Sequence, residues 1–157
     1  LLISVSLFML GCGQPTIIPK APQHSQETNA HIEMHIVPRS DFHTILTEKY
    51  GDQYQNVQGI LFNGFVSISS RNNQINTGTI LIGQELTDEK KQHVLLEETT
   101  QALGLLNDSY NYSESIFYNG ASNNSAFSAI DKQVIQLLYD PAIQAGMDQN
   151  TIQSIYN

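Results

Sequence analysis

The sequence predicts one α+β domain, with a small mixed sheet, a central helix that carries the candidate site and a packed C-terminal helix. Three patterns predict it: apolar and polar residues alternate over 31–36, an apolar run lies within 78–83, and apolar residues recur at helical spacing over 87–104. The 157 residues suffice for one domain with a sizeable core and are too few for two. We place this domain at residues 30–157.

The N-terminal segment predicts export. Residues 1–11 form an apolar run that is too short to span a bilayer core of ~30 Å. The initiating Met and the basic residues that precede such a run are missing, so we expect a truncated signal peptide. The run ends in Gly11-Cys12, which resembles the bacterial lipobox, and Cys12 is the only cysteine. We therefore expect Cys12 to carry a lipid; the alternative is an ordinary signal peptide with an incidental cysteine.

Residues 12–29 hold the lipidated cysteine and a segment with three prolines and no hydrophobic period, which predicts a flexible tether. The tether would hold the domain near a membrane of the bacterial cell envelope. Gly13 stands where an Asp would resemble an inner-membrane retention signal, so the periplasmic face of the outer membrane is favoured.

The domain begins with a strand over 31–36. Ile32, Met34 and Ile36 alternate with polar residues, which predicts a half-buried strand with these three side chains inside. His31 and His35 share the polar face, lie about 13 Å apart at ~3.3 Å per residue, and are too distant to bind one metal together. We interpret them as histidines that face solvent.

A short amphipathic helix follows, with Ser40 as its expected N-cap and Gly51 just past its end. Strands are expected over 59–69 and 78–83, with a polar turn or loop at 71–76 between them.

The segment 87–104 has the clearest helix start and stop signals in the chain. Thr87 or Asp88 is the expected cap, acidic residues fill the first turn, and Gly104 terminates the helix. At ~100° per residue, four polar side chains share one side. They are His93, Glu97, Glu98 and Gln101. Such a stripe on an otherwise apolar helix faces water or lines a cleft.

The C-terminal part of the sequence is expected to have a structural role. The apolar face of its helix is expected to be core, and Pro141 to end the helix. That face comprises Phe127, Ile130, Val134, Leu137 and Leu138. We expect Asp131 on a solvated face, with a supporting contact to the residues of the cleft as the alternative, and Asp148 as the cap of a last short helix.

The helix resembles the metal-binding helix of metzincin zinc proteases, H-E-x-x-H-x-x-G-x-x-H. Glu98 and Gly104 match that pattern, while three other residues stand where it has histidines. Those three are Glu97, Gln101 and Asn107. The segment 115–118 is similar to the Met-turn that follows, with Phe117 in place of Met. The resemblance implies a zincin-like layout in which the zinc-binding histidines are replaced.

A closer resemblance covers most of the domain. "LLEETTQALGLLNDS", "SESIFYNG" and "AIDKQVIQLLYDPAIQAGM" are similar to the bacterial family called domain of unknown function 2927, found in exported proteins and lipoproteins. That family has no established activity, so the resemblance implies a class of protein and no reaction.

The chemistry of the stripe leaves three interpretations open. In the first, the helix uses its polar groups to hold the loop that carries Asn107, Asp108 and Ser115. In the second, a divalent metal binds Glu97, Gln101 and Asp108; His93 with Glu97 is a second possible pair, which would suit a transition metal better. Oxygen donors suit calcium, magnesium or manganese better than zinc. The third is an active site without metal.

Two functions follow. The first is a cell-envelope lipoprotein that uses a protease-like fold with a degenerate metal site for a binding or structural role, with an envelope protein or peptide as its partner. The second is a divergent metal-dependent hydrolase of peptides or cell-wall material, with Glu98 as general base. Seven basic residues stand against fifteen acidic ones, a formal net charge of −8, and the basic residues are scattered. That distribution argues against nucleic acid, whose phosphates need a basic face.

Overall fold

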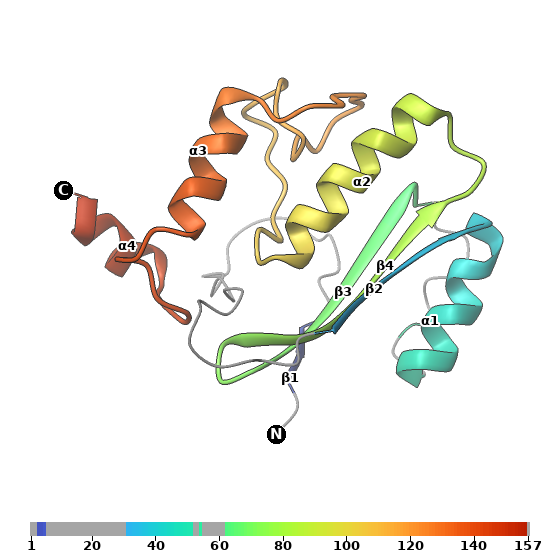
Figure 1. The fold of residues 1–157 in the computed structure, drawn as a ribbon, viewed down its shortest axis with the longest axis horizontal. Coiled ribbons are helices and arrows are strands. Elements are labelled where there is room, and N and C mark those ends of the chain that lie inside the picture. The colour runs from blue at the N-terminus through green and yellow to red at the C-terminus, as the bar shows by residue number, and fades with distance from the viewer. Residues whose placement is uncertain (1–2, 6–30, 52–53, 55–61, 157) are drawn as a thin grey trace.

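The fold is a small sheet with a helix on each face, and it belongs to the mixed α+β class that the sequence predicts (Figure 1). The computed structural model describes residues 3–5, 31–51, 54 and 62–156. The elements, in chain order, are β1 (Ile3–Val5), β2 (His31–Val37), the 3-10 helix η1 (Arg39–Asp41), α1 (Phe42–Tyr50), β3 (Gly64–Arg71), β4 (Gln74–Gly83), α2 (Asp88–Ala102), α3 (Ala129–Leu138) and α4 (Gln149–Tyr156). The predicted signal peptide and tether, Cys12 included, lie outside the described residues apart from 3–5. No helix in the described part of the chain is long and apolar enough to cross a membrane.

The sheet is mixed, as predicted, with the strand order β1-β3-β4-β2. β3 and β4 pair antiparallel, and β2 pairs parallel with β4 along its whole length. A parallel pair needs a crossover connection, and α1 lies within it. The expected loop at 71–76 is a tighter turn, because Asn72 and Asn73 adopt left-handed φ angles of 52° and 60° that asparagine tolerates.

Two apolar cores lie on opposite faces of the sheet. α2 packs against β3 and β4 on one face, and α1 packs on the other, as Figure 1 shows. The buried residues of the α2 core are Ile68, Ile75, Ile80, Ile82, Val94, Ala102 and Leu106. Those of the α1 core are Phe42, Leu46, Tyr54 and Leu81.

The start of α1 differs from expectation. Ser40 is not the N-cap; it lies inside η1, and Asp41 precedes the first residue of α1. The chain enters through a 3-10 turn, in which the Asp41 amide donates to the Pro38 carbonyl at 2.9 Å. Gly51 ends the helix with φ 76°, as predicted.

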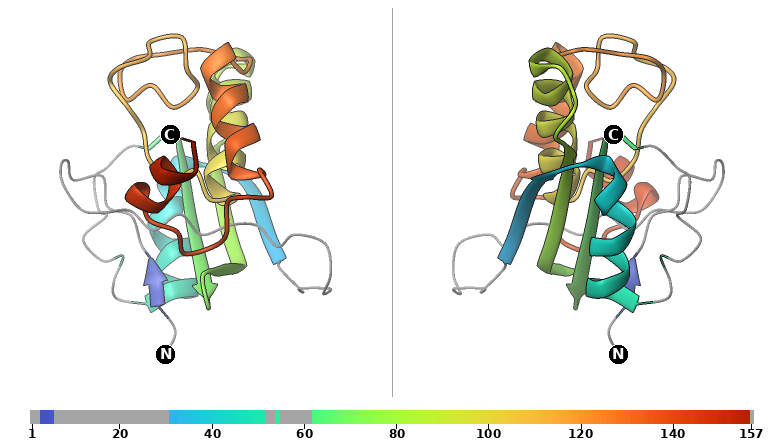
Figure 2. Two further views of the ribbon diagram at one scale, coloured as in Figure 1. Left: turned by 90° about the vertical axis from the view of Figure 1, so that its left-hand side faces the viewer. Right: turned by 90° about the vertical axis from the view of Figure 1, so that its right-hand side faces the viewer.

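α3 lies beside α2 on the side away from the sheet (Figures 1 and 2). It begins after Ser128 and ends at Leu138, before Pro141. Leu138 is buried, but Leu137 is exposed, so the expected apolar face is only partly core. Between the two helices lies an apolar cleft of about 500 Å³, with Leu96, Leu103 and Ile135 in its walls. Before α4, the Asp148 carboxylate accepts from the Thr151 amide at 2.8 Å, the predicted cap.

The predicted burial of β2 is wrong. Ile32, Met34 and Ile36 are exposed, because β2 is an edge strand and α2 packs on the two strands beyond it. His31 and His35 face solvent, as expected, and both flank Glu33, which also pairs with Lys49 of α1.

Candidate functional site

The candidate site is built on α2, whose ends form as the sequence predicts. The Thr87 hydroxyl accepts the Lys90 amide at 3.3 Å, an N-cap bond that satisfies a free amide of the first turn. At the other end Gly104 has φ 120°, and its amide donates to the Gln101 carbonyl at 2.9 Å. This left-handed glycine turns the chain away from the helix axis. The connection 103–128 then forms a lobe to one side of α2 (Figure 2).

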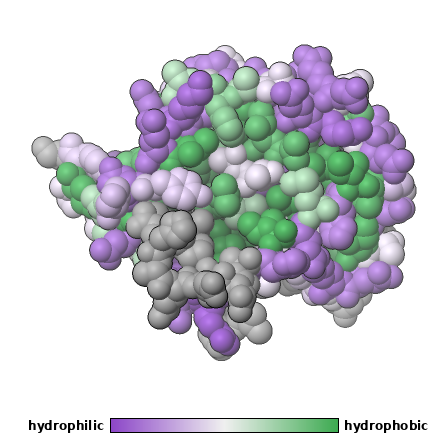
Figure 3. Space-filling model, in the orientation of Figure 1, coloured by the Kyte–Doolittle hydropathy of each residue, from purple (hydrophilic) through white to green (hydrophobic). Residues whose placement is uncertain are grey.

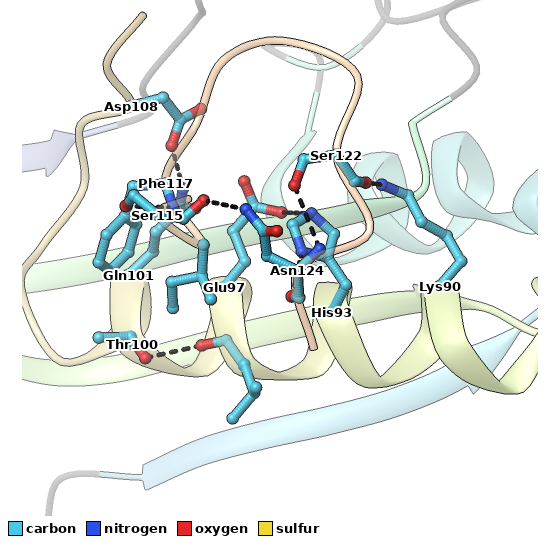
Figure 4. A network of polar contacts seen from close by, with 12 residues as sticks. Lys90, His93, Glu97, Thr100, Gln101, Asp108, Ser115, Phe117, Ser122 and Asn124 are labelled. Atoms are coloured by element: carbon cyan, nitrogen blue, oxygen red, sulfur yellow. Dashed lines mark hydrogen bonds and ion pairs between the residues drawn. The ribbon is translucent and has the colours of Figure 1, made fainter. Parts of the chain in front are cut away.

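The polar stripe of α2 divides between two surroundings. His93, Glu97 and Gln101 face the connection that follows the helix, where Figure 4 shows them under a network of polar contacts. Glu98 instead lies over β3, and a Cβ atom added to Gly64 would come within 2.5 Å of its Oε1. Glycine at this position leaves the room that the Glu98 side chain occupies.

His93 joins the helix to the far end of the connection. It is 3% exposed, and its Nδ1 lies 2.8 Å from the Asn124 carbonyl oxygen, which can only accept. Burial lowers the pKa of His93, which favours the neutral ring. A neutral ring that donates through Nδ1 leaves Nε2 as an acceptor, and Nε2 lies 3.4 Å from Glu97 Oε2. A protonated Glu97 would complete that contact.

Three carboxyl groups gather around this contact. Burial, and then the charge of Asp108, raise the pKa of Glu97 to about 7, against the opposing effect of Lys90. Burial raises the pKa of Asp108 to about 6, although the Gln101 amide, which donates to its Oδ1 at 2.9 Å, lowers it. Burial, Glu97 and Asp108 together raise the pKa of Glu98 well above its usual range. The cluster therefore holds protons near neutral pH.

The connection is tied to α2 at several points along its length (Figure 4). The Asn124 side-chain amide donates to the Ser113 carbonyl at 2.8 Å and to the Ser115 carbonyl at 3.0 Å. The Lys90 ammonium donates to the Ser122 carbonyl at 2.6 Å. Asn124 therefore makes two kinds of contact. Its side-chain amide links two parts of the connection, and its backbone carbonyl links the connection to His93 of α2.

Asp131 of α3 anchors the same connection from the other side. It is 1% exposed, so the expectation that it lies on a solvated face is wrong. Its carboxylate accepts from the Ser115 hydroxyl at 2.5 Å, the Ile116 amide at 3.2 Å and the Ser128 amide at 2.7 Å. Asp131 is the third helical residue after the Ser128 cap, and the two form a capping box.

Several of the possible metal ligands bind groups of the protein instead. Among the described residues, no group of three or more His, Cys, Asp and Glu side chains is arranged to hold a metal ion. The Gln101 amide is bound to Asp108, and His93 Nδ1 is bound to a carbonyl. Asn107, which stands at the third histidine position of the protease pattern, is exposed. Without such a group among the described residues, the arrangement fits a hydrogen-bonded network better than a metal centre.

Two residues that hold the site together are not among the predicted site residues. Asn124 lies 31 positions from its partner His93, and no local pattern marks it. Asp131 lies 16 positions from Ser115. The spacing Ser128-x-x-Asp131 is that of a capping box, so it predicts that Asp131 lies at the start of a helix. It does not predict the contact between Asp131 and the connection.

Comparison with known proteins places the chain in a family. The model of a family described as "Protein of unknown function (DUF2927)" matches residues 16–157. No curated protein and no solved structure matches the chain.

Proposed function

The chain belongs to the DUF2927 family, and from this premise we propose that it is a lipid-anchored protein of the bacterial cell envelope with a binding or structural role. In this proposal the domain has a zincin-like layout, and its former metal-binding helix holds a surface lobe, 103–128, in a fixed shape. The partner is a protein or peptide of the envelope. The lipid on Cys12 tethers the domain to the membrane, with the periplasmic face of the outer membrane favoured.

One contact carries the proposal. Gln101 occupies the position of the second histidine in the protease pattern, and its amide nitrogen donates to Asp108 in the connection that follows. This bond ties the amide nitrogen of Gln101 to the lobe, which supports a structural role for the side chain. His93 makes a second contact of this kind, because it is buried and its Nδ1 is bound to the Asn124 carbonyl of the lobe.

The layout also supports a zincin-like ancestry. Within residues 31–83, a strand, a helix and an antiparallel pair of strands precede α2, and Gly104 turns the chain at the position where the protease pattern has its glycine. The order of elements is therefore compatible with a protease-like scaffold whose ligands were replaced.

Elemental analysis tests the proposal directly. The chain, purified from membranes in detergent, is dialysed against zinc, manganese and calcium and compared with a variant that carries both Glu97→Ala and Gln101→Ala. We expect no stoichiometric metal in either protein. Near-stoichiometric metal that is lost in the variant would overturn the proposal in favour of a metalloenzyme. Metabolic labelling with palmitate tests the anchor, because Cys12→Ser should abolish the label.

A second function is favoured by the carboxyl cluster. Glu97 retains 18% side-chain exposure and a pKa of about 7, the properties of a general acid or base at neutral pH. Glu98 is less suitable as the base, because burial keeps its pKa well above the usual range. A hydrolase of peptides or cell-wall material would therefore lose turnover with Glu97→Gln more than with Glu98→Gln. Absence of turnover in the parent protein, on peptide and peptidoglycan substrates, would reject this alternative.

A further inference from the structure

The edge strand β2 exposes an apolar strip. Ile32, Met34 and Ile36 are 37%, 43% and 53% exposed, although they alternate regularly along one strand. Their register with β4, in which Met34 lies beside Ile80 and Ile36 beside Ile82, puts them on the α2 face of the sheet. α2 covers β3 and β4 and leaves this strip open. Figure 3 shows apolar surface that extends from the region of α2 towards this edge of the sheet.

β2 has few of the features that commonly protect an edge strand. Natural edge strands discourage pairing with charged side chains, lysines above all, and with prolines, bulges or very short length. β2 is seven residues long, contains neither lysine nor proline, has Glu33 as its one acidic residue, and keeps an unbroken register with β4. In the part of the chain that the structure describes, no strand lies on its outer side. The outer side of β2 therefore offers backbone groups to a further strand.

The side chains of β2 are complementary to those of a second, antiparallel β2. When two copies meet with Met34 opposite Met34, Ile32 lies opposite Ile36, and the apolar strip continues across the junction. On the other face, Glu33 lies opposite His35 of the second copy, and the reverse pair forms by symmetry. Both pairs bring an acid beside a basic side chain. If the register between the two strands shifted by one residue, each apolar side chain of one copy would lie opposite a polar side chain of the other.

We propose that β2 is a homodimer interface, in which two copies pair their β2 strands antiparallel about a twofold axis at Met34. The two sheets then join into one continuous sheet, and the interface is isologous, as a C2 dimer requires. α1 of each copy lies on one face of this sheet and α2 on the other, so neither helix blocks the outer edge of β2. The occupant is a second copy because the strand's own pattern is self-complementary in both charge and hydrophobicity.

Disulfide trapping tests the pairing and its register. In a Cys12→Ser chain, Met34→Cys should form a covalent dimer on oxidation with copper-phenanthroline, since opposed residues have Cβ atoms about 5 Å apart. Ile36→Cys should not link to itself, because the two positions lie about 13 Å apart along the strands. A mixture of the Ile36→Cys and Ile32→Cys chains should link. Glu48→Cys, exposed on α1, is the matched control and should form no covalent dimer.

Light scattering on the full chain in detergent completes the test. We expect a dimer at micromolar concentration that Met34→Glu converts to monomer, since two carboxylates would then meet at the axis. Thr44→Glu, also exposed but on α1, should leave the dimer intact. A parent protein that is monomeric up to about 100 µM would overturn the proposal, as would Ile36→Cys chains that link to themselves as readily as Met34→Cys chains. A β2 strand that instead captures a peptide of another protein would give the monomeric result.

Discussion

Removal of the Asp131 carboxylate should destabilise the protein more than any change on the polar face of α2. The carboxylate is almost fully buried and accepts three hydrogen bonds, from the Ser115 hydroxyl and from the amides of Ile116 and Ser128. These donors come from the connection and from the start of α3. Asp131→Ala therefore leaves three donors without their acceptor and removes half of a capping box.

The magnitude follows from these contacts. A hydrogen bond to a charged group is worth about 1.5–3 kcal/mol, and such contributions are not additive when they share one acceptor. Loss of an N-cap interaction costs about 1 kcal/mol. We expect Asp131→Ala to lower the free energy of unfolding by about 4 kcal/mol, which is a large part of the ~5–15 kcal/mol of a typical domain. At roughly 2–4 °C per kcal/mol, Tm should fall by about 8–16 °C.

Urea denaturation followed by circular dichroism measures this loss. Asp131→Asn keeps one carbonyl acceptor and should cost about half as much. Gln133→Ala, two positions away and exposed, is the matched control and should change the free energy of unfolding by less than about 0.5 kcal/mol. An Asp131→Ala protein within about 1 kcal/mol of the parent would refute the view that this carboxylate anchors the connection.

Three further predictions concern the site and its support. The raised pKa of Glu97 means that its contribution to stability is present below about pH 4.5 and is lost as pH rises through about 7. The stability of the parent relative to Glu97→Gln should therefore fall by at least about 1 kcal/mol between pH 5 and pH 8, and an unchanged difference would contradict the shift. Gly64→Ala should destabilise by about 2 kcal/mol or more in urea denaturation, since its Cβ would lie 2.3 Å from Val94 Cγ1. Gly78→Ala, where the nearest atoms are at 3.4 Å, should cost clearly less, and equal losses would refute the packing argument. Asn124→Ala should speed hydrogen exchange in residues 109–125, while unchanged protection there would show that other contacts hold the connection.

Much of the fold was predictable because helix caps and turns are local. Thr87, Gly51 and Gly104 act within a few residues of their positions, so their roles follow from neighbours along the chain. The common side of His93, Glu97 and Gln101 likewise follows from the helical repeat. These features depend on backbone geometry that every helix shares.

Tertiary structure decided which of these faces are covered and by what. Alternation along β2 determined that Ile32, Met34 and Ile36 share a face, but their exposure followed from the edge position of the strand. The sequence placed Asp131 on a polar side of its helix, and the packing of a distant segment made that side buried. Periodicity records which side chains point the same way, whereas burial depends on the element that packs against them. That element is set by pairings between residues far apart in the chain.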